Sequence, residues 1–283
     1  MDLKSKIILI SGPTASGKTN FAVKLAKKIN GEIINADSMQ VYKELKILTA
    51  RPSKNEQKNI KHHLYGFQSV KKIFSTGSWL NHTIKKIKEI KKRNKIPILV
   101  GGTGLYFKAL IDGLVKIPDI PKKIRIQIRN IQKKMGQEEF YKMLVKLDPL
   151  SRDKINPNDI QRAIRAYEIK KYTKKSLFEW FNKTKKNFKK EQFFKIYIDY
   201  PRPQLINRIN KRVEEMFDRG AVREVKNFLK LKARKDNSSN KVIGIEEISD
   251  FIEKSHDLQQ TKDRIAIKTR QYAKRQSTWA RRY

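Results

Sequence analysis

The octet at residues 12–19 contains the residue types that hold a phosphate chain. Its letters, GPTASGKT, fit the pattern G-x-x-x-x-G-K-[ST], and they stand between an apolar run and a helical pattern. Glycines let the backbone curl so that successive N–H groups face inward, where the start of a helix adds partial positive charge. The loop comprises Gly12, Pro13, Thr14, Ala15, Ser16, Gly17, Lys18 and Thr19. We expect Lys18 to contact the outer phosphates and the Thr19 hydroxyl to ligate Mg²⁺.

Two further polar side chains stand where apolar runs end. Asp37 follows the run 33–36, and Thr103 follows the run 96–100. Carboxyl ends of parallel strands meet beside the phosphate loop, where ligands bind. Asp37 is thus a metal ligand, a base for an incoming nucleophile, or an N-cap for a helix after Ser38. Thr103 hydrogen-bonds the same nucleophile or is a turn residue between glycines.

The residues after the run 96–100 argue against an ordinary kinase or ATPase. Such enzymes carry an aspartate at the end of a second strand, where it holds Mg²⁺. Here Gly101, Gly102, Thr103 and Gly104 follow instead. A small-molecule or nucleotide kinase with ATP in the loop remains the alternative enzyme. A non-catalytic RNA-binding module would tolerate loss of Lys18 or Asp37, yet both are present.

The elements that must position these residues form an α/β pattern. Four apolar runs predict buried parallel strands at 7–10, 33–36, 96–100 and 193–198, alternating with helical patterns. Between 118 and 192 no strand-like run occurs, and apolar residues recur at helical spacing. We therefore expect a P-loop parallel-sheet core formed by 1–118 and 193–283, with a helical insertion domain at 119–192.

Charge and composition narrow the class of partner. The 283 residues include 66 Lys and Arg against 28 Asp and Glu, a net charge of +38, which predicts a large acidic partner such as nucleic acid. Lysine also suits a solvated surface, so local basic segments carry more weight. The chain has no cysteine, no run long enough to span a membrane and no signal-peptide pattern at its start. We expect a cytoplasmic protein without a membrane partner.

Three basic segments are placed at helical spacing. Arg162 and Arg165 are three apart and share a face that suits phosphates or splayed bases. Segment 274–281 interleaves cations with Trp279, which fits a backbone grip with a stacking platform or a solvated tail packed by one indole. Arg208 and Arg212 lie on one face of a helix predicted at 204–217.

Seven segments together resemble one family, the bacterial tRNA dimethylallyltransferases or isopentenyltransferases. They run in family order over nearly the whole chain: GPTASGKT at 12–19, DSMQVY at 37–42, TARPS at 49–53, HHL at 62–64, GGTGLY at 101–106, NDIQRAIRAYEI at 158–169 and KTRQYAKRQSTWARR at 268–282. The resemblance implies transfer of a dimethylallyl group from dimethylallyl diphosphate to N6 of the adenosine 3′ of the anticodon, in tRNAs reading UNN codons. The products are N6-(dimethylallyl)adenosine and diphosphate.

The resemblance also implies roles for individual residues. The loop, together with Arg208 and Arg212, binds the diphosphate, and Thr19 ligates the cofactor Mg²⁺. The alternative for the two arginines is that they lie on a solvated helix face. Asp37 is the base, Thr103 positions the amine and Lys18 stabilises the leaving charge. Contacts to the tRNA anticodon stem–loop fall on Asp37, Ser38, Met39, Gln40, Thr103, Arg125, Gln161, Arg162, Ala163, Ile164, Arg165, Lys274, Arg275, Gln276, Trp279 and Arg281.

Two details stand apart from those roles. Ile245 occupies a position where the family usually has Tyr after Gly, and His62-His63 matches the family without an evident chemistry, so we expect packing or loop anchoring there. Nothing in the sequence argues against a monomer.

Overall fold

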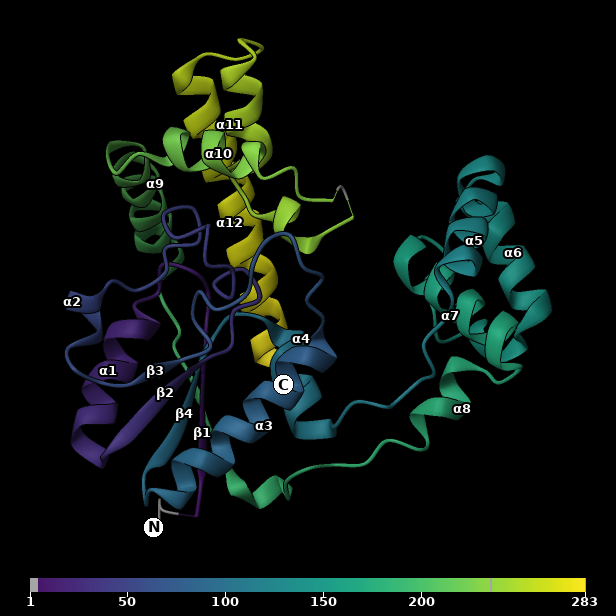
Figure 1. Ribbon diagram of the computed structural model, residues 1–283, viewed down its shortest axis with the longest axis horizontal. Coiled ribbons are helices and arrows are strands. Elements are labelled where there is room, and N and C mark those ends of the chain that lie inside the picture. The colour runs from purple at the N-terminus through teal and green to yellow at the C-terminus, as the bar shows by residue number, and fades with distance from the viewer. Residues whose placement is uncertain (1–4, 235, 283) are drawn as a thin grey trace. The chain divides into compact units, whose positions relative to one another are not determined.

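A sheet of five parallel strands carries the candidate site. The computed structural model describes residues 5–234 and 236–282. The strands are β1 (Ile7–Ser11), β2 (Gly31–Asn35), β3 (His62–His63), β4 (Ile96–Gly101) and β5 (Phe193–Tyr197), in the order β3-β2-β4-β1-β5. Four of them confirm the predicted strands and the α/β class (Figure 1). The fifth, β3, is the His62-His63 pair, which is too short to show an apolar pattern.

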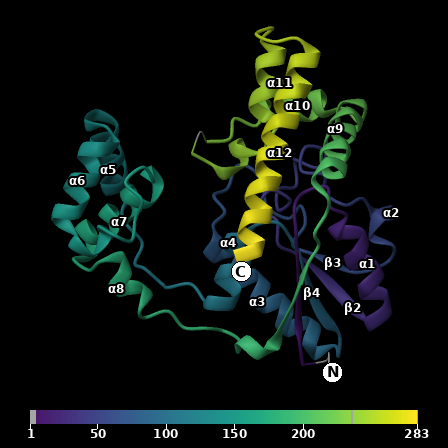
Figure 2. The same cartoon turned by 180° about the vertical axis from the view of Figure 1, so that it is seen from behind.

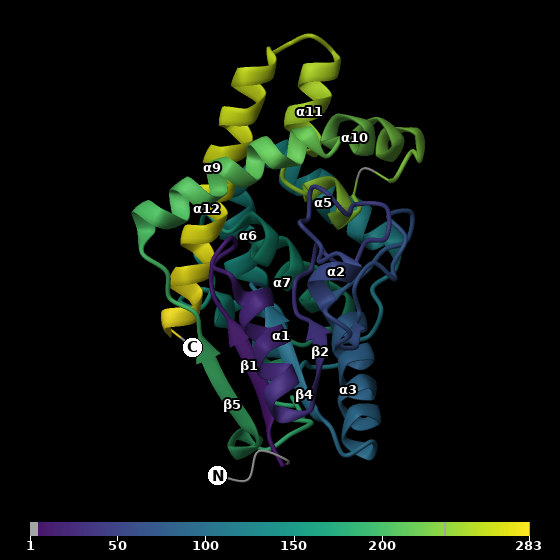
Figure 3. The same ribbon diagram turned by 90° about the vertical axis from the view of Figure 1, so that its left-hand side faces the viewer.

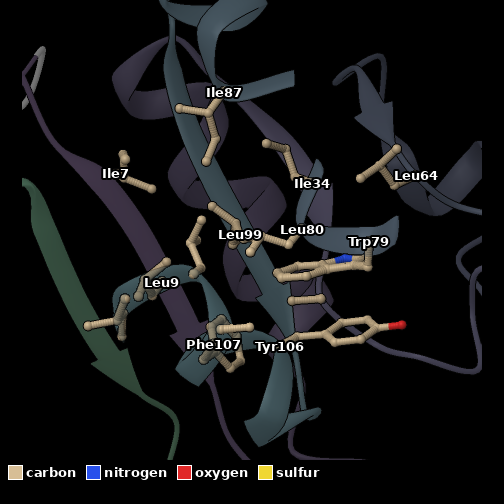
Figure 4. Packing of buried hydrophobic residues seen from close by; sticks show 14 of the residues in the cluster. Ile7, Leu9, Ile34, Leu64, Trp79, Leu80, Ile87, Leu99, Tyr106 and Phe107 are labelled. Carbon is tan, nitrogen blue, oxygen red and sulfur yellow. The ribbon is translucent and has the colours of Figure 1, made fainter. Parts of the chain in front are cut away.

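Helices cover both faces of the sheet, which is why the strands are apolar on both sides. Along β1, Ile8 and Ile10 pack towards α1 (Lys18–Ile29), whereas Ile7 and Leu9 pack towards α3 (Thr76–Lys92) and α4 (Gly104–Asp112). Figure 4 shows the second of these faces. Buried strand ends are thereby held rigidly where the polar residues begin.

One buried indole fixes the end of β2. Trp79 on α3 stacks on Tyr106 of α4, with ring centroids 4.1 Å apart (Figure 4). Its Nε1 donates a hydrogen bond of 2.9 Å to the carbonyl oxygen of Asn35, the last residue of β2. Because both rings are buried in the core, this bond determines where the chain leaves the strand towards Asp37.

The chain divides into two compact units, Met1–Ile111 with Asn187–Tyr283, and Asp112–Lys186. The sequence-based prediction was an insertion at 119–192. The second unit contains α5 (Lys122–Met135), α6 (Gln137–Leu147), a 3-10 turn at Pro149–Ser151, α7 (Ile160–Thr173) and α8 (Leu177–Phe181). Figure 2 shows α5, α6 and α7 packed together. Phe140, Leu144 and Ile164 lie in their common core.

Four long or medium helices complete the first unit. They are α9 (Arg202–Asp218), α10 (Ala221–Lys230), α11 (Ile245–Ile252) and α12 (Leu258–Arg282), with α2 (Lys54–Gln57) and 3-10 turns at Lys190–Gln192 and Ser238–Lys241. Figure 3 shows α9 passing α12, against which it packs. Ile245 begins α11 and is buried in the core that these helices share with 41–48. Within 5–234 and 236–282, no helix has the length and apolar character to cross a bilayer.

Substituting Gly101 with alanine is expected to destabilise the first unit by about 3 kcal/mol. A Cβ at Gly101 would lie 2.1 Å from the carbonyl carbon and oxygen of Ala36, so backbone would have to move. Urea unfolding measures the loss. Gly31→Ala is the milder comparison, because its new Cβ would lie 2.6 Å from the Ile98 Cδ1, the far end of a side chain, and 3.1 Å from the Ile96 carbonyl oxygen, so the backbone would have to move less. Equal losses in both variants would contradict this explanation.

Candidate active site

The loop 12–19, which joins β1 to α1, has a conformation that suits anion binding. Gly17 has a φ of +86°, and α1 begins at Lys18 with no side chain capping its first N–H groups. The Ser16 side chain is buried, and its Oγ has no hydrogen-bond partner among the described residues. Free N–H groups at a helix start, together with an unsatisfied hydroxyl, suit the oxygens of a phosphate chain.

Three cations gather on this loop. Lys18 Nζ donates to the carbonyl oxygen of Pro13, and Arg212 Nη1 donates to Thr14 Oγ1 over 3.0 Å. Arg208, on the same helix α9, would have its Nη2 3.7 Å from a Cβ built on Gly17. The structure thus brings both predicted arginines to the loop, although their role in diphosphate binding stays a prediction.

Burial sets the protonation of Lys18. The pKa of the ammonium falls from 10.5 to about 7, chiefly because burial disfavours the charged form; the charge of Asp37 raises this pKa and that of Arg212 lowers it. A buried cation beside other cations is costly unless an anion joins them. The site is therefore built to receive negative charge.

Asp37 is held by the side chain of Asn35. The Asp37 N–H donates to Asn35 Oδ1 over 2.8 Å, and Asn35 Nδ2 donates back to the Asp37 carbonyl oxygen over 2.9 Å. The Asp37 carboxylate accepts the N–H of Met39 over 2.9 Å. In the described chain no helix starts directly after Ser38, and the next helix is α2 (Lys54–Gln57). The interpretation of Asp37 as an N-cap is therefore wrong.

The environment of Asp37 favours a proton acceptor. Burial raises the pKa of the carboxyl above its ordinary value, whereas the Met39 N–H and the Lys18 charge partly lower it. A carboxylate with a raised pKa is a stronger base than an exposed one. Among the described residues, no cluster of three or more His, Cys, Asp and Glu side chains is arranged to hold a metal.

Thr103 connects the ends of β2 and β4. Its Oγ1 accepts the N–H of Ser38 over 2.9 Å and donates to Ser38 Oγ over 3.2 Å. The Tyr272 side chain, from α12, lies near Thr103 and Gln276; burial raises the pKa of its hydroxyl, and these two side chains lower it to a smaller extent. The structure therefore brings Asp37, Ser38 and Thr103 together, as predicted, and adds a tyrosine that sequence analysis missed.

The helix α12 is tied to the site by two side chains predicted to contact tRNA. Gln276 is buried, and its Oε1 accepts the N–H of Thr14 over 2.7 Å. A Cβ at Gly102 would lie 1.8 Å from Gln276 Nε2, so any larger residue there would displace the end of the Gln276 side chain. Trp279 lies against Gly104 and stacks with Phe107 at 6.1 Å. Both side chains thus pack α12 on the turn 101–104.

The other predicted residues of the first unit lie nearby with more exposure. Lys274 and Arg275 are exposed, and Arg275 lies over the Tyr272 ring at 5.9 Å. Arg281 is 3.8 Å from Asp199. Gln40 Nε2 donates to the carbonyl oxygen of Thr49 over 2.9 Å. Its contact tethers the loop 48–50, which forms a wall of the cavity described next.

A cavity of about 300 Å³ is lined by Asp37 and by Thr14 of the loop 12–19. Its polar lining includes Thr14, Asp37, Arg212, Tyr272 and Arg275. Its apolar lining includes Met39, Leu48, Ile209, Val213, Met216, Val242, Ile243 and Ile265. A larger groove of about 910 Å³ runs between α9 and α12 but contains neither Asp37 nor a loop residue. The smaller cavity is therefore the candidate active site.

The predicted residues of the second unit divide by exposure. Arg162 is 72% exposed and lies 3.4 Å from Asp159, and Gln161 is also exposed. Arg125 and Arg165 lie near the buried Glu168. The side chains of Ala163 and Ile164 are in the core of the unit, and the contacts of all these residues with tRNA stay a prediction.

Tyr272 and Asn35 are the functional residues that sequence reasoning missed. Tyr272 precedes Gln276 by four residues, so both lie on one face of a helix, and this spacing was the available signal. Asn35 carried no signal of its own, because its side chain acts only through the backbone of Asp37.

Comparison with known proteins identifies the family. A model described as IPP transferase matches residues 40–283. The tRNA dimethylallyltransferase of Pelagibacter ubique (strain HTCC1062) is 63% identical over 281 residues, 99% of this chain and 90% of that protein, and that of Rickettsia massiliae (strain Mtu5) is 44% identical over 277 residues, covering 98% and 76%.

Solved structures agree with the sequence comparison. A eukaryotic dimethylallyltransferase acting on tRNA superposes with a TM-score of 0.83 at 32% identity, covering 97% of this chain and 69% of that one. The full-length tRNA isopentenylpyrophosphate transferase of Bacillus halodurans gives a TM-score of 0.69 at 34% identity, covering 99% and 88%. The chain therefore belongs to the tRNA dimethylallyltransferase (IPP transferase) family.

Proposed function

We infer that the chain transfers the dimethylallyl group of dimethylallyl diphosphate to N6 of the adenosine 3′ of the anticodon, in tRNAs reading UNN codons. One observation carries the inference. A partly buried carboxylate, Asp37, and a residue of a cation-surrounded phosphate loop, Thr14, line the same cavity. A kinase would need no base for an adenine amine, and the relatives named above are transferases, so the kinase alternative is disfavoured.

The donor fits the cavity in two parts. The diphosphate would accept hydrogen bonds from the N–H groups that begin α1 and from the side chains of Lys18, Arg208 and Arg212. The five-carbon group would lie against the apolar wall that includes Leu48, Val213 and Ile243. Apolar contact of this kind excludes water from the carbon under attack.

The loop also fits a Mg²⁺ ion bound with the diphosphate. Mg²⁺ prefers oxygen ligands and takes few from the protein when phosphates are present. The Thr19 hydroxyl, in the first turn of α1, would be the ligand that the protein supplies to the ion. Among the described residues no cluster of three or more His, Cys, Asp and Glu side chains is arranged to supply further ligands. When bound, the ion supplies charge stabilisation for the leaving diphosphate.

The acceptor amine would be activated by Asp37. The N6 lone pair of adenine is delocalised, so its attack is aided when a carboxylate takes the proton. As the bond between N6 and C1 of the prenyl group forms, the bond between C1 and the diphosphate oxygen breaks, and the N6 proton moves to Asp37. Thr103, which is hydrogen-bonded to Ser38, would orient the amine.

The target base must leave the anticodon-loop stack to reach Asp37. The basic residues of α7 and α12, including Arg162, Lys274 and Arg275, would hold the RNA phosphates. We propose that the enzyme acts as a monomer, since nothing in the sequence argues against one.

A mass measurement tests the function. Purified protein and Mg²⁺ are incubated with an unmodified anticodon stem–loop RNA bearing adenosine after the anticodon, with dimethylallyl diphosphate or ATP in separate tubes. The RNA should gain one dimethylallyl group with the prenyl donor alone. An unchanged RNA, together with ATP consumption when small-molecule acceptors are added, would support the kinase instead.

The rate of transfer should depend on the protonation of Asp37. Because burial raises the pKa of this carboxyl, its base form is lost at a higher pH than for an ordinary aspartate. The single-turnover rate is therefore expected to fall about tenfold per pH unit on the acid side, with its midpoint above the usual aspartate range. RNA affinity should stay level over the same range. A midpoint at or below that range would contradict the role of burial.

A further inference from the structure

A buried glutamate is shared by three arginines in the second unit. The Glu168 side chain on α7 is 1% exposed, and its Oε1 has no hydrogen bond from any described residue. Its Oε2 lies 3.8 Å from Arg125 Nε and 3.4 Å from Arg165 Nη1, and its Oε1 lies 3.6 Å from Arg129 Nε. Arg125 and Arg129 come from α5, so the cluster joins two helices.

The cluster carries a net positive charge. Three guanidinium groups face one carboxylate, and the arginine side chains are 48%, 46% and 41% exposed. Each guanidinium has five N–H donors, and contacts of this length to Glu168 engage few of them. The remaining donors reach solvent, where phosphodiester oxygens are the acceptors that arginine matches best.

The Glu168 carboxylate restrains the positions of the three arginine side chains. A buried charge is costly unless it is paired, so the Glu168 side chain favours conformations in which the arginines approach it. Without it, three adjacent cations would repel one another and spread. Arg125 and Arg129 are four apart on α5, and Arg165 precedes Glu168 by three residues on α7, so each reaches the carboxylate without distorting its helix.

We propose that Glu168 is a positioning residue for an RNA-phosphate site made of Arg125, Arg129 and Arg165. The inference rests on the proposed function, because the phosphates are those of the acceptor RNA. The proposal adds Arg129 to the RNA-binding residues. It also assigns the buried Glu168 an indirect role in binding the acceptor RNA.

A charge-matched pair of variants tests the proposal. Glu168→Gln and Glu138→Gln each remove one negative charge from the second unit, and Glu138 is 83% exposed on α6. The affinity for the unmodified anticodon stem–loop is measured against salt concentration. If Glu168 positions the arginines, Glu168→Gln should weaken RNA binding about tenfold, whereas Glu138→Gln should leave it level or slightly tighter. Tighter binding in both variants would overturn the proposal, since net charge alone would then decide affinity.

Steady-state kinetics separate positioning from loss of structure. Glu168→Gln should raise the KM for RNA about tenfold and leave kcat at saturating RNA and the affinity for dimethylallyl diphosphate unchanged. A fall in kcat with unchanged KM would overturn it. If the wild-type protein transfers no dimethylallyl group, the proposed function fails; if it transfers normally while Glu168→Gln binds RNA like wild type, only this inference fails.

A second pair decides the matter if Glu168→Gln does not fold. Arg129→Gln and Lys134→Gln each remove one positive charge from α5, and Lys134 is exposed in its last turn. Arg129→Gln should reduce the slope of log affinity against log salt by about 0.7 to 0.9, the value for one phosphate, and Lys134→Gln should change it little. Equal changes in both variants would overturn the proposal.

Discussion

Replacing Asp37 with asparagine is expected to lower kcat about a thousandfold, within the range for loss of a general base. Asparagine has the same shape, and its oxygen can still accept the Met39 N–H, so the loop should keep its conformation. What is lost is an acceptor for the N6 proton in the transition state. The affinities for dimethylallyl diphosphate and for RNA should therefore stay within about threefold of wild type.

The comparison variant is Asp218→Asn, which makes the same change at an exposed position at the end of α9. Single-turnover transfer and RNA binding are measured for both proteins. If Asp37→Asn lost RNA affinity as much as turnover, Asp37 would be a binding residue rather than a base. If it lost neither, the proton would leave by another route.

The residues with local signals were the ones that sequence analysis could assign. The loop 12–19 depends on the conformations of neighbouring residues, so its glycines and Lys18 reveal it directly. The strands β1 and β4 are apolar on both faces because helices cover both, and such runs are visible without a structure. The shorter apolar stretches of β2 and β5 were found in the same way. Asp37 and Thr103 followed from the rule that strand ends share one edge.

The residues that sequence analysis missed act through partners far along the chain. Asn35 acts through the backbone of Asp37, and Tyr272 lies on a helix far along the chain from Thr103. Gln276 and Trp279 were predicted as tRNA contacts, but only the structure shows how closely they approach Gly102 and Gly104. The strand β3 has two residues, too few for a pattern; it pairs in parallel with β2, and His63 Nε2 lies 2.7 Å from the buried Glu32. Glu168 likewise has no local signal, since its partners are on another helix.

Lys18→Ala is expected to reduce kcat/KM for dimethylallyl diphosphate about a thousandfold, because it removes a partly buried cation that would stabilise the charge developing on the leaving diphosphate. Arg208 and Arg212 approach the same loop from α9, so part of the donor affinity should remain. The loss should therefore fall more on kcat than on the Kd for the donor.

Lys24→Ala is the matched control, since it removes one positive charge from an exposed position of the same helix. It should leave transfer within about twofold of wild type, because solvent screens a charge at the surface. Lys18 also lowers the pKa of Asp37. In Lys18→Ala the acid limb of the residual activity should then move to higher pH, whereas a lysine that only shaped the loop would leave that limb in place. If Lys18→Ala both lowers the rate and moves the acid side of the pH–rate profile, Lys18 acts on the diphosphate and on Asp37.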